Sequence, residues 1–337
     1  MEDRSRNNSS WPLYLAGVLL FLGLSTLMLW NIELPYLAWS TGPVSDAADA
    51  IVIEGQPTFD PEGELLMLTV LSQDVNIFEA LIAGLDPDID LVRKENVRSP
   101  DESDEEYRTR VLAQMDDSQS RAISVALQEL GFELVPRDVI VIEIIVGLPA
   151  DAVLEPGDSI NTVNGIEIVR SADVPAALDG LKPGDTVTLG ITREGTKQQV
   201  ELVLAARDDD PDAPIMGIVV RELTDPPFPV TIEAGNVGGP SAGMMHTLAI
   251  IDTLTPGEMT KGHVIAGTGT IQLDGSVGNI GGIRQKVAGA EAAGATIILV
   301  PAGNYEEALT ADYEDIEIVP VATLQEALAY LEGLDPA

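Results

Sequence analysis

The segment GNVGGPSAGMMHTLAIIDTL, residues 235–254, is a glycine-rich turn followed by an apolar helical stretch. A turn of this kind delivers Ser241 to the start of a helix, where free backbone N–H groups and the positive end of the dipole can stabilise an oxyanion. Pro240 fixes φ, and Gly239 allows a substrate to approach closely. We therefore interpret Ser241 as a candidate nucleophile, with Gly239, Pro240 and Ala242 supporting its site.

A second glycine-rich segment, GTGTIQLDGSVGNIGGIRQKVAGA, covers residues 267–290. Asp274-Gly275 predicts a hairpin turn between two short strands, and a helix is expected to begin near Gly282. One face of that helix, at the spacing of three and four residues, contains Ile283, Lys286, Val287, Ala290 and Gly294. Burial on this apolar face lowers the pKa of a lysine, as a neutral amine base requires. The alternative is that Lys286 lies at the edge of the face and extends its ammonium group to solvent.

Together these segments resemble the proteolytic domain of the Lon peptidase family, whose serine lies in a G-P-S-A-G element and whose lysine follows in a G-G-x-x-x-K helix. Residues 239–243 and 281–286 match both elements in order and separation. The resemblance implies an α/β (α+β) proteolytic domain with Ser241 as nucleophile and Lys286 as general base. It also implies that Thr268 hydrogen-bonds the lysine, and that the reaction needs no metal or other cofactor.

A different module precedes the two segments. Residues 147–150 (GLPA) and 157–165 (GDSINTVNG) resemble the G-x-P-A and G-D-x-I-x-x-V-N-G elements of the PDZ domain, a mainly β fold. A PDZ domain binds an extended peptide by strand addition, and loop amides hold the terminal carboxylate. The resemblance places the carboxylate loop at Leu130-Gly131-Phe132. Alternatively, Gly131 only ends an amphipathic helix expected over 115–130.

Helix 115–130 weakly resembles the early M-x-x-S-x-x-x-A helix of the Lon proteolytic domain, which implies that the PDZ domain is inserted into a split proteolytic domain. Bacterial proteins that are tethered to the membrane and combine these two domains are the closest overall likeness. The expected organisation is a cytoplasmic tail at 1–10, a transmembrane helix at 11–30, a linker at 31–49, the first proteolytic part at 50–130, the PDZ domain at 131–206 and the second proteolytic part at 207–337.

The N-terminal segment contains no charge over residues 13–29, and Trp11 and Trp30 flank it. Twenty residues of helix span about 30 Å, which is enough to cross a bilayer. Arg4 and Arg6 precede the segment, so the positive-inside bias predicts a single-pass cell-membrane protein with a cytoplasmic N-terminus and an extracytoplasmic catalytic part. The alternative is a cleaved signal peptide, although the nearest small-x-small site, 48–50, lies far beyond the apolar run.

Composition excludes several classes of function. The net charge of −37, with only 18 lysines and arginines, argues against a nucleic-acid partner. The absence of cysteine excludes disulfides and thiolate metal sites. No G-x-x-x-x-G-K-[ST] motif occurs, so ATP-driven unfolding in the same chain is not expected. We expect protein or peptide substrates, and a homo-oligomeric ring follows only by analogy with the Lon family.

Two other functions remain open. Residues 239–243 also satisfy G-x-S-x-G, the nucleophile elbow of α/β-hydrolases, and Ser241, Asp252 and His263 occur in the order of a catalytic triad. The spacing between them is too short for that fold, and His246 points about 140° away from Ser241 on the same helix. A non-catalytic PDZ scaffold is the other alternative. The favoured hypothesis is an ATP-independent serine endopeptidase that acts on extracytoplasmic proteins or peptides.

Overall fold

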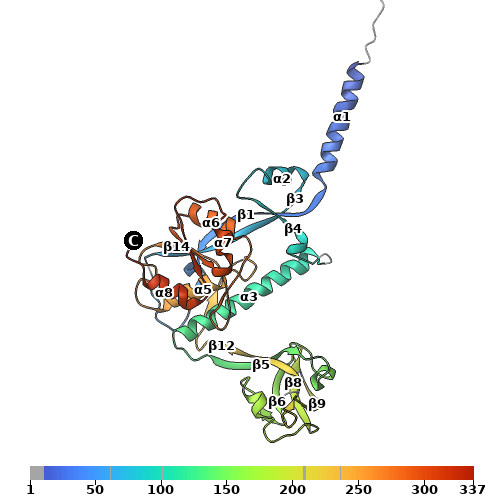
Figure 1. Ribbon diagram of the computed structural model, residues 1–337, viewed down its shortest axis with the longest axis vertical. Helices are drawn as coiled ribbons and strands as arrows, with labels where there is room; N and C mark the ends of the chain where they lie inside the picture. Colours follow the sequence, from blue (N-terminus) through green and yellow to red (C-terminus); the bar gives the residue numbers. More distant parts are fainter. Residues whose placement is uncertain (1–10, 61, 100–101, 208–209, 236) are drawn as a thin grey trace, which may run out of the picture. The chain divides into compact units, whose positions relative to one another are not determined.

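The computed structural model describes residues 11–60, 62–99, 102–207, 210–235 and 237–337, so the predicted tail at 1–10 lies outside it. The chain forms two compact units (Figure 1). The α/β unit combines the described residues up to Ala126 with residues 230–337. The β-rich unit consists of residues 127–229.

The α/β unit is built on a six-stranded mixed sheet with the order β18-β17-β14-β3-β1-β4. The strands from β18 to β3 run parallel to their neighbours, whereas β1 is antiparallel to both β3 and β4. Their bounds are β1 (Glu33–Asp46), β3 (Glu64–Asn76), β4 (Asp90–Arg93), β14 (Val264–Gly267), β17 (Ile297–Pro301) and β18 (Glu317–Val321). Shorter strands are β2 (Ile51–Ile53), β13 (Val230–Ile232), β15 (Thr270–Ile271) and β16 (Val277–Gly278).

Two helices of this unit carry the segments singled out in the sequence. Helix α5 (Gly243–Leu254) is buried from Gly243 to Asp252, which explains why its sequence is apolar on every side. Helix α6 (Ile283–Ala292) packs Ile283, Val287 and Ala290 against apolar residues of the sheet. The remaining helices are α1 (Trp11–Trp30), α2 (Ile77–Ala83), α3 (Asp104–Glu129), α7 (Tyr305–Ala308) and α8 (Leu324–Glu332).

Residues 31–49 were expected to be a linker, yet most of them form β1. The linker was predicted because the segment contains Pro35 and Pro43, and proline cannot donate a ladder hydrogen bond and is typical of loops. Both lie where the register between β1 and β3 shifts, between Glu33 and Leu37 and between Thr41 and Val44. The irregularities therefore accommodate the prolines without ending the strand.

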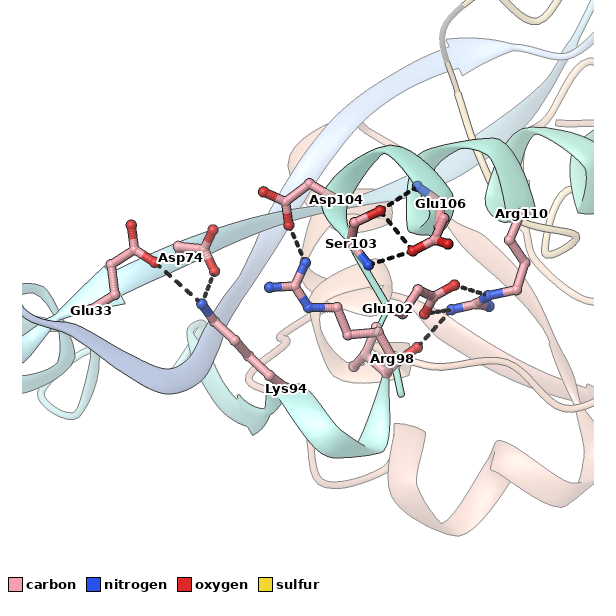
Figure 2. Close-up of polar contacts among 10 residues, drawn as sticks. Glu33, Asp74, Lys94, Arg98, Glu102, Ser103, Asp104, Glu106 and Arg110 are labelled. Carbon is pink, nitrogen blue, oxygen red and sulfur yellow. Dashed lines mark hydrogen bonds and ion pairs between the residues drawn. The ribbon is translucent and has the colours of Figure 1, made fainter. Parts of the chain in front are cut away.

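Helix α3 begins at Asp104, before the amphipathic stretch expected over 115–130 and directly after Ser103, which the Ser103-x-x-Glu106 spacing marks in the sequence as a candidate N-cap. Figure 2 shows the reason, which is a capping box at its first turn. Glu106 N–H donates to Ser103 Oγ at 3.3 Å, and Ser103 N–H donates to the Glu106 carboxylate at 2.8 Å. Ion pairs of Arg98 with Asp104 and of Arg110 with Glu102 lie beside it. A cap of this kind contributes about 1 kcal/mol to helix stability.

The β-rich unit is an antiparallel sheet with the order β12-β5-β6-β8-β9, and β7 pairs with β6. It extends to residue 229, beyond the predicted boundary at 206, because β12 pairs with β5 along its whole length. The bounds are β5 (Val135–Ile144), β6 (Ser159–Val163), β7 (Ile166–Glu167), β8 (Thr186–Arg193), β9 (Thr196–Val203), β10 (Ala205–Ala206), β11 (Pro214–Ile215) and β12 (Ile218–Asp225), with helix α4 (Asp173–Ala176).

The turn at Asn164-Gly165 has φ values of 50° and 79°, which is the left-handed conformation that an Asn-Gly hairpin prefers. Buried residues of β5, β6, β8 and α4 form the core of this unit. In the α/β unit, β2 pairs antiparallel with β13, so residues on either side of the β-rich unit in sequence lie together in one sheet.

The predicted transmembrane helix is contradicted. Residues Trp11–Trp30 form α1, but within the described ranges no helix has both the length and the apolar character needed to cross a bilayer. This finding removes the support for a single-pass cell-membrane protein with a cytoplasmic N-terminus and an extracytoplasmic catalytic part.

Candidate active site

Ser241 lies two residues before α5, in a loop that contacts α3 at several points. Gly239 N–H donates to the Val111 carbonyl at 2.9 Å, and the Ser118 hydroxyl donates to the Pro240 carbonyl at 3.0 Å. Gly239 has a φ of 90°, so a side chain at this position would strain the backbone. These contacts hold the loop that carries Ser241 against α3, a helix that is distant from the loop in sequence.

Lys286 extends from α6 to Ser241 and is only 2% exposed. Its Nζ lies 2.9 Å from Ser241 Oγ and 2.8 Å from Thr268 Oγ1. No carboxylate of the described chain forms a salt bridge with it. Burial therefore lowers the pKa of Lys286 to about 7, because nothing offsets the cost of desolvating the ammonium form. A substantial fraction of the amine is neutral near pH 7.

Thr268 connects the lysine to the backbone of the serine. Its hydroxyl donates to the Ser241 carbonyl at 3.1 Å and accepts from Lys286 Nζ at 2.8 Å. Gly269 N–H also donates to the Ser241 carbonyl, at 2.8 Å. Because the Thr268 proton is engaged by a carbonyl, the hydroxyl presents a lone pair to the amine. This arrangement orients one amine N–H toward Thr268 and leaves the amine lone pair available to Ser241.

The glycine pair before Lys286 has a packing role. An ideal Cβ on Gly281 would lie 2.9 Å from Trp39 Cη2, and one on Gly282 would lie 2.7 Å from Val70 Cγ2. Gly282 also has a φ of 69° at the N-cap of α6. Trp39 and Val70 therefore pack directly against the backbone that starts the lysine helix, and only glycine leaves room for them.

Two backbone N–H groups remain available beside Ser241. Gly239, Gly243 and Met244 N–H groups donate to protein carbonyls. The N–H groups of Ser241 and Ala242 have no protein acceptor among the described residues. Among the residues predicted to support an oxyanion, Ala242 therefore has an unpaired N–H in the described chain, as Ser241 does, whereas the Gly239 N–H already donates to a carbonyl.

A cleft of about 730 Å³ opens at the Ser241–Lys286 pair. Of the described side chains that line it, Lys286 is the only one with an amine, guanidinium or carboxylate, although the whole chain carries a net charge of −37. Residues on its wall include Trp39, Val70, Tyr107 and Ile280. The sequence did not identify Trp39 and Tyr107 as residues of the site, because Trp39 lies in the segment expected to be a linker and Tyr107 lies in a highly charged stretch.

The residues of the rival esterase are not assembled around the serine. His246 is fully buried, neither ring nitrogen has a partner in the described chain, and burial lowers its pKa to about 4. His263 Nε2 lies 2.9 Å from the Asp335 carbonyl. Burial raises the pKa of Asp252 to about 6, near the end of α5. In the described chain the Ser241 hydroxyl has Lys286 as its side-chain partner, and neither histidine.

Leu130, Gly131 and Phe132 lie in the β-rich unit between α3 and β5. Gly131, with a φ of 78°, donates its N–H to the Gln128 carbonyl, and Phe132 donates to the Leu127 carbonyl. The Phe132 ring contacts Phe228 edge to face, at 5.1 Å between centroids. These bonds are those of a helix C-cap.

Family comparisons match two separate parts of the chain. Residues 114–204 match the PDZ domain, and residues 230–331 match the Lon protease (S16) C-terminal proteolytic domain. A Lon protease of Phenylobacterium zucineum is 33% identical over 163 residues, which cover 46% of this chain and 19% of that protein. Lon protease 1 of Sorangium cellulosum is 41% identical over 110 residues, covering 30% of this chain and 13% of the relative.

A probable periplasmic serine endoprotease DegP-like of Ectopseudomonas mendocina is 29% identical over 96 residues, which cover 26% of this chain and 20% of the relative. Among solved structures, the PDZ domain of an SdrC-like protein from Listeria monocytogenes is 28% identical, covers 24% of this chain and 85% of that chain, and has a TM-score of 0.23.

The chain spans no more than 20% of the length of these curated relatives. Both matched segments contain the motifs described above, with Gly147-Leu148-Pro149-Ala150 in the first and Ser241 and Lys286 in the second. The chain therefore contains a PDZ domain and a Lon protease (S16) C-terminal proteolytic domain.

Proposed function

We propose that this chain is an ATP-independent serine endopeptidase in which Ser241 is the nucleophile and Lys286 is the general base. The observation that carries the proposal is the 2.9 Å separation between Ser241 Oγ and the Nζ of a lysine whose pKa is lowered by burial to about 7. A base with a pKa near the working pH is the most effective in general catalysis. The matched Lon proteolytic domain supports the same choice of chemistry.

In the proposed reaction, neutral Lys286 accepts the Ser241 proton while Oγ attacks the scissile carbonyl carbon. The resulting ammonium group then donates that proton to the leaving amine as the C–N bond breaks, which leaves an acyl group on Ser241. The neutral amine next accepts a proton from water, which attacks the acyl carbon. The ammonium group then returns that proton to Ser241 Oγ as the ester C–O bond breaks, so the free acid leaves and the neutral amine is restored. Thr268 acts as a positioning residue, because it holds one N–H of the amine and so directs the lone pair.

The oxyanion formed in each step needs donors that are already in place. We assign this role to the N–H groups of Ser241 and Ala242, which lie just before α5 and have no acceptor in the described part of the chain. Removing one donor of this kind typically slows catalysis by about 100- to 1,000-fold. Pro240 and Gly239 contribute indirectly by holding the loop against α3.

A polypeptide is the substrate that best fits the cleft. Its described lining contains apolar and uncharged polar side chains together with loop glycines, and Lys286, which is assigned to catalysis, is the only basic or acidic side chain among them. The PDZ domain supports recognition of protein or peptide partners, since binding an extended peptide is the physical use of such a sheet edge.

The proposal is tested by hydrolysis of labelled casein by the full chain, with and without MgATP. We expect cleavage that ATP does not change, and loss of nearly all activity in Ser241→Ala and Lys286→Ala. Lys197→Met is the matched control, because Lys197 is an exposed lysine on β9. Wild-type activity in either of the first two variants, each shown to be folded, would reject the assignment of the pair.

A further inference from the structure

One wall of the cleft beside Ser241 is made of irregular backbone. Residues 279–281 lie between β16, which ends at Gly278, and α6, which begins at Ile283, and all three line the cleft. In the described chain no backbone–backbone hydrogen bond ties this segment to another. A segment without such bonds keeps one conformation only where side chains hold it.

Asn304 supplies the only hydrogen bonds of this segment among the described residues. Its Oδ1 accepts from Ile280 N–H at 2.9 Å, and its Nδ2 donates to the Ile280 carbonyl at 3.1 Å. One planar amide can pair with both groups only where the N–H and the C=O of a residue point to the same side, as they do in an extended strand. Asn304 therefore takes the place of a neighbouring strand.

The position of Asn304 in its own segment indicates that this contact is its main role. The residue is 5% exposed and lies at the N-cap of α7, where an asparagine side chain commonly bonds the first turn of the helix. Here the side chain makes no capping bond and extends instead to a residue 24 positions away in sequence. The local stabilisation of a cap is given up for the contact with Ile280.

Gly303 packs against the same wall. An ideal Cβ at this position would overlap the side-chain amide of Asn279, so only glycine lets Asn279 lie there. Ile280 in turn packs on the apolar core that includes Val287 of α6. Two consecutive residues of the wall are therefore held by two consecutive residues after β17.

The opposite edge of the segment is open. Neighbouring residues of an extended segment direct their backbone groups to opposite sides, and both groups of Ile280 face Asn304. Those of Asn279 and Gly281 therefore face the other way. Both residues are exposed, line the cleft and have no partner for these groups in the described chain. An extended peptide in the cleft can bond to them without breaking an existing hydrogen bond.

We propose that Asn304 is a positioning residue for the peptidase reaction. It holds the backbone of Ile280 so that the edge formed by Asn279 and Gly281 stays open in the cleft and binds the main chain of the substrate. The Asn304 side chain bonds Ile280 alone among the described residues, so it acts on the substrate through the wall. The inference rests on the proposed function, because it assigns a substrate-binding wall to the proposed active site.

The test compares two substrates of the full chain. One is an internally quenched, C-terminally amidated peptide from a casein site that the wild type cleaves, and the other is p-nitrophenyl acetate, with Ser241→Ala as background. Asn304→Leu keeps the branched shape of the side chain and removes both bonds to Ile280. Its KM for the peptide is expected to rise at least about tenfold while kcat falls less than about threefold, since the wall binds ground state and transition state alike. The acetyl group is too short to need the wall, so acylation by the ester is expected to slow by no more than about twofold.

Two further variants separate positioning from general stability. Asn76→Leu is the matched control, because Asn76 is 7% exposed and caps α2 through two backbone N–H groups. It is expected to lower the melting temperature and to leave KM within about twofold of wild type. Gly303→Ala keeps Asn304 but displaces Asn279, and is expected to raise KM at least about threefold.

An unchanged KM in folded Asn304→Leu, or an equal rise of KM in Asn76→Leu, would overturn the inference. An equal loss of peptide cleavage and acetyl-ester acylation in Asn304→Leu would also overturn it, because Asn304 would then support the Ser241–Lys286 pair and not the wall. If Asn304→Leu does not fold, the KM of Gly303→Ala decides in the same way. A wild-type chain that leaves casein intact would reject the proposed function and this inference together, whereas an active wild type with unchanged KM in both variants would reject the role of Asn304 alone.

Discussion

Replacing Lys286 by methionine is expected to stabilise the protein while abolishing the proposed activity. Methionine has a similar length and carries no charge, so it fills the same buried path without a desolvation cost. The lowering of the lysine pKa from 10.5 to about 7 on folding measures that cost in the wild type. At 1.36 kcal/mol for each pKa unit, it amounts to about 5 kcal/mol below pH 7.

The sign and the pH window follow from the protons bound in each state. Between about pH 7 and pH 10.5 the lysine is protonated in the unfolded chain and neutral in the folded one, so wild-type stability rises with pH. Below pH 7 both states are protonated and the full cost remains. The advantage of Lys286→Met is therefore largest at pH 6 and is smaller by about 3 kcal/mol at pH 9.

Loss of two hydrogen bonds reduces the gain by an amount that does not depend on pH. Ser241 Oγ and Thr268 Oγ1 both lose Nζ, at about 1–3 kcal/mol for each group left unpaired. The net stabilisation at pH 6 is therefore a few kcal/mol at most. The difference between pH 6 and pH 9 is unaffected by this loss and is the quantity to measure.

Urea unfolding followed by tryptophan fluorescence provides the assay. All three tryptophans, Trp11, Trp30 and Trp39, precede residue 127, so the fluorescence reports the α/β unit and not the β-rich unit. Lys261→Met is the control for the loss of a lysine outside the site, because Lys261 is half-buried and lies in the α/β unit that the fluorescence reports. The reasoning is refuted if Lys286→Met has the same effect on the free energy of unfolding at pH 6 and pH 9.

Three further perturbations test the same site. Peptidase kcat/KM is expected to rise about tenfold from pH 6 to pH 8 and to level off by about pH 9, because the neutral fraction of Lys286 follows a pKa of about 7. A steady-state pH profile measures this rise, and a rise that continues to pH 10 would contradict the prediction. Thr268→Val removes the hydroxyl that accepts from Lys286 Nζ and is expected to lower kcat about 10- to 100-fold. Thr268→Ser keeps a hydroxyl and is expected to retain most of the wild-type kcat. An equal loss of kcat in the two variants would exclude the positioning role. Ser118→Ala removes the hydrogen bond to the Pro240 carbonyl. This change is expected to lower the free energy of unfolding by about 1 kcal/mol and to reduce kcat while KM changes less. Unchanged kinetics and an unchanged melting temperature would show that this hydrogen bond does not hold the loop.

The local parts of the site were predictable from the sequence. The hairpin turn at Asp274-Gly275, the helix start at Gly282 and the apolar face that contains Lys286 all follow from turn chemistry and helical spacing. Each of these patterns is set by residues a few positions apart, where spacing and structure are closely linked.

The parts that depend on distant segments were not predictable. Trp39 reaches the glycines before Lys286 from a strand interrupted by prolines, and its segment was expected to be a linker. The Gly239 N–H donates to the Val111 carbonyl and so is not free to bind an oxyanion, and no sequence motif indicates this hydrogen bond. The apolar run at 11–30 predicted a membrane span that the described helices do not provide. For Trp39 and Gly239 the outcome depends on contacts with residues outside the local window.

Trapping of the acyl intermediate tests the central claim most directly. The full chain is mixed with a peptide p-nitrophenyl ester and quenched in acid, and the acyl group is located by tandem mass spectrometry. We predict acylation of Ser241 in the wild type, none in Ser241→Ala and a rate lower by at least about 100-fold in Lys286→Met. Acylation at another residue, or acylation of Ser241 at the wild-type rate without the lysine, would contradict the account.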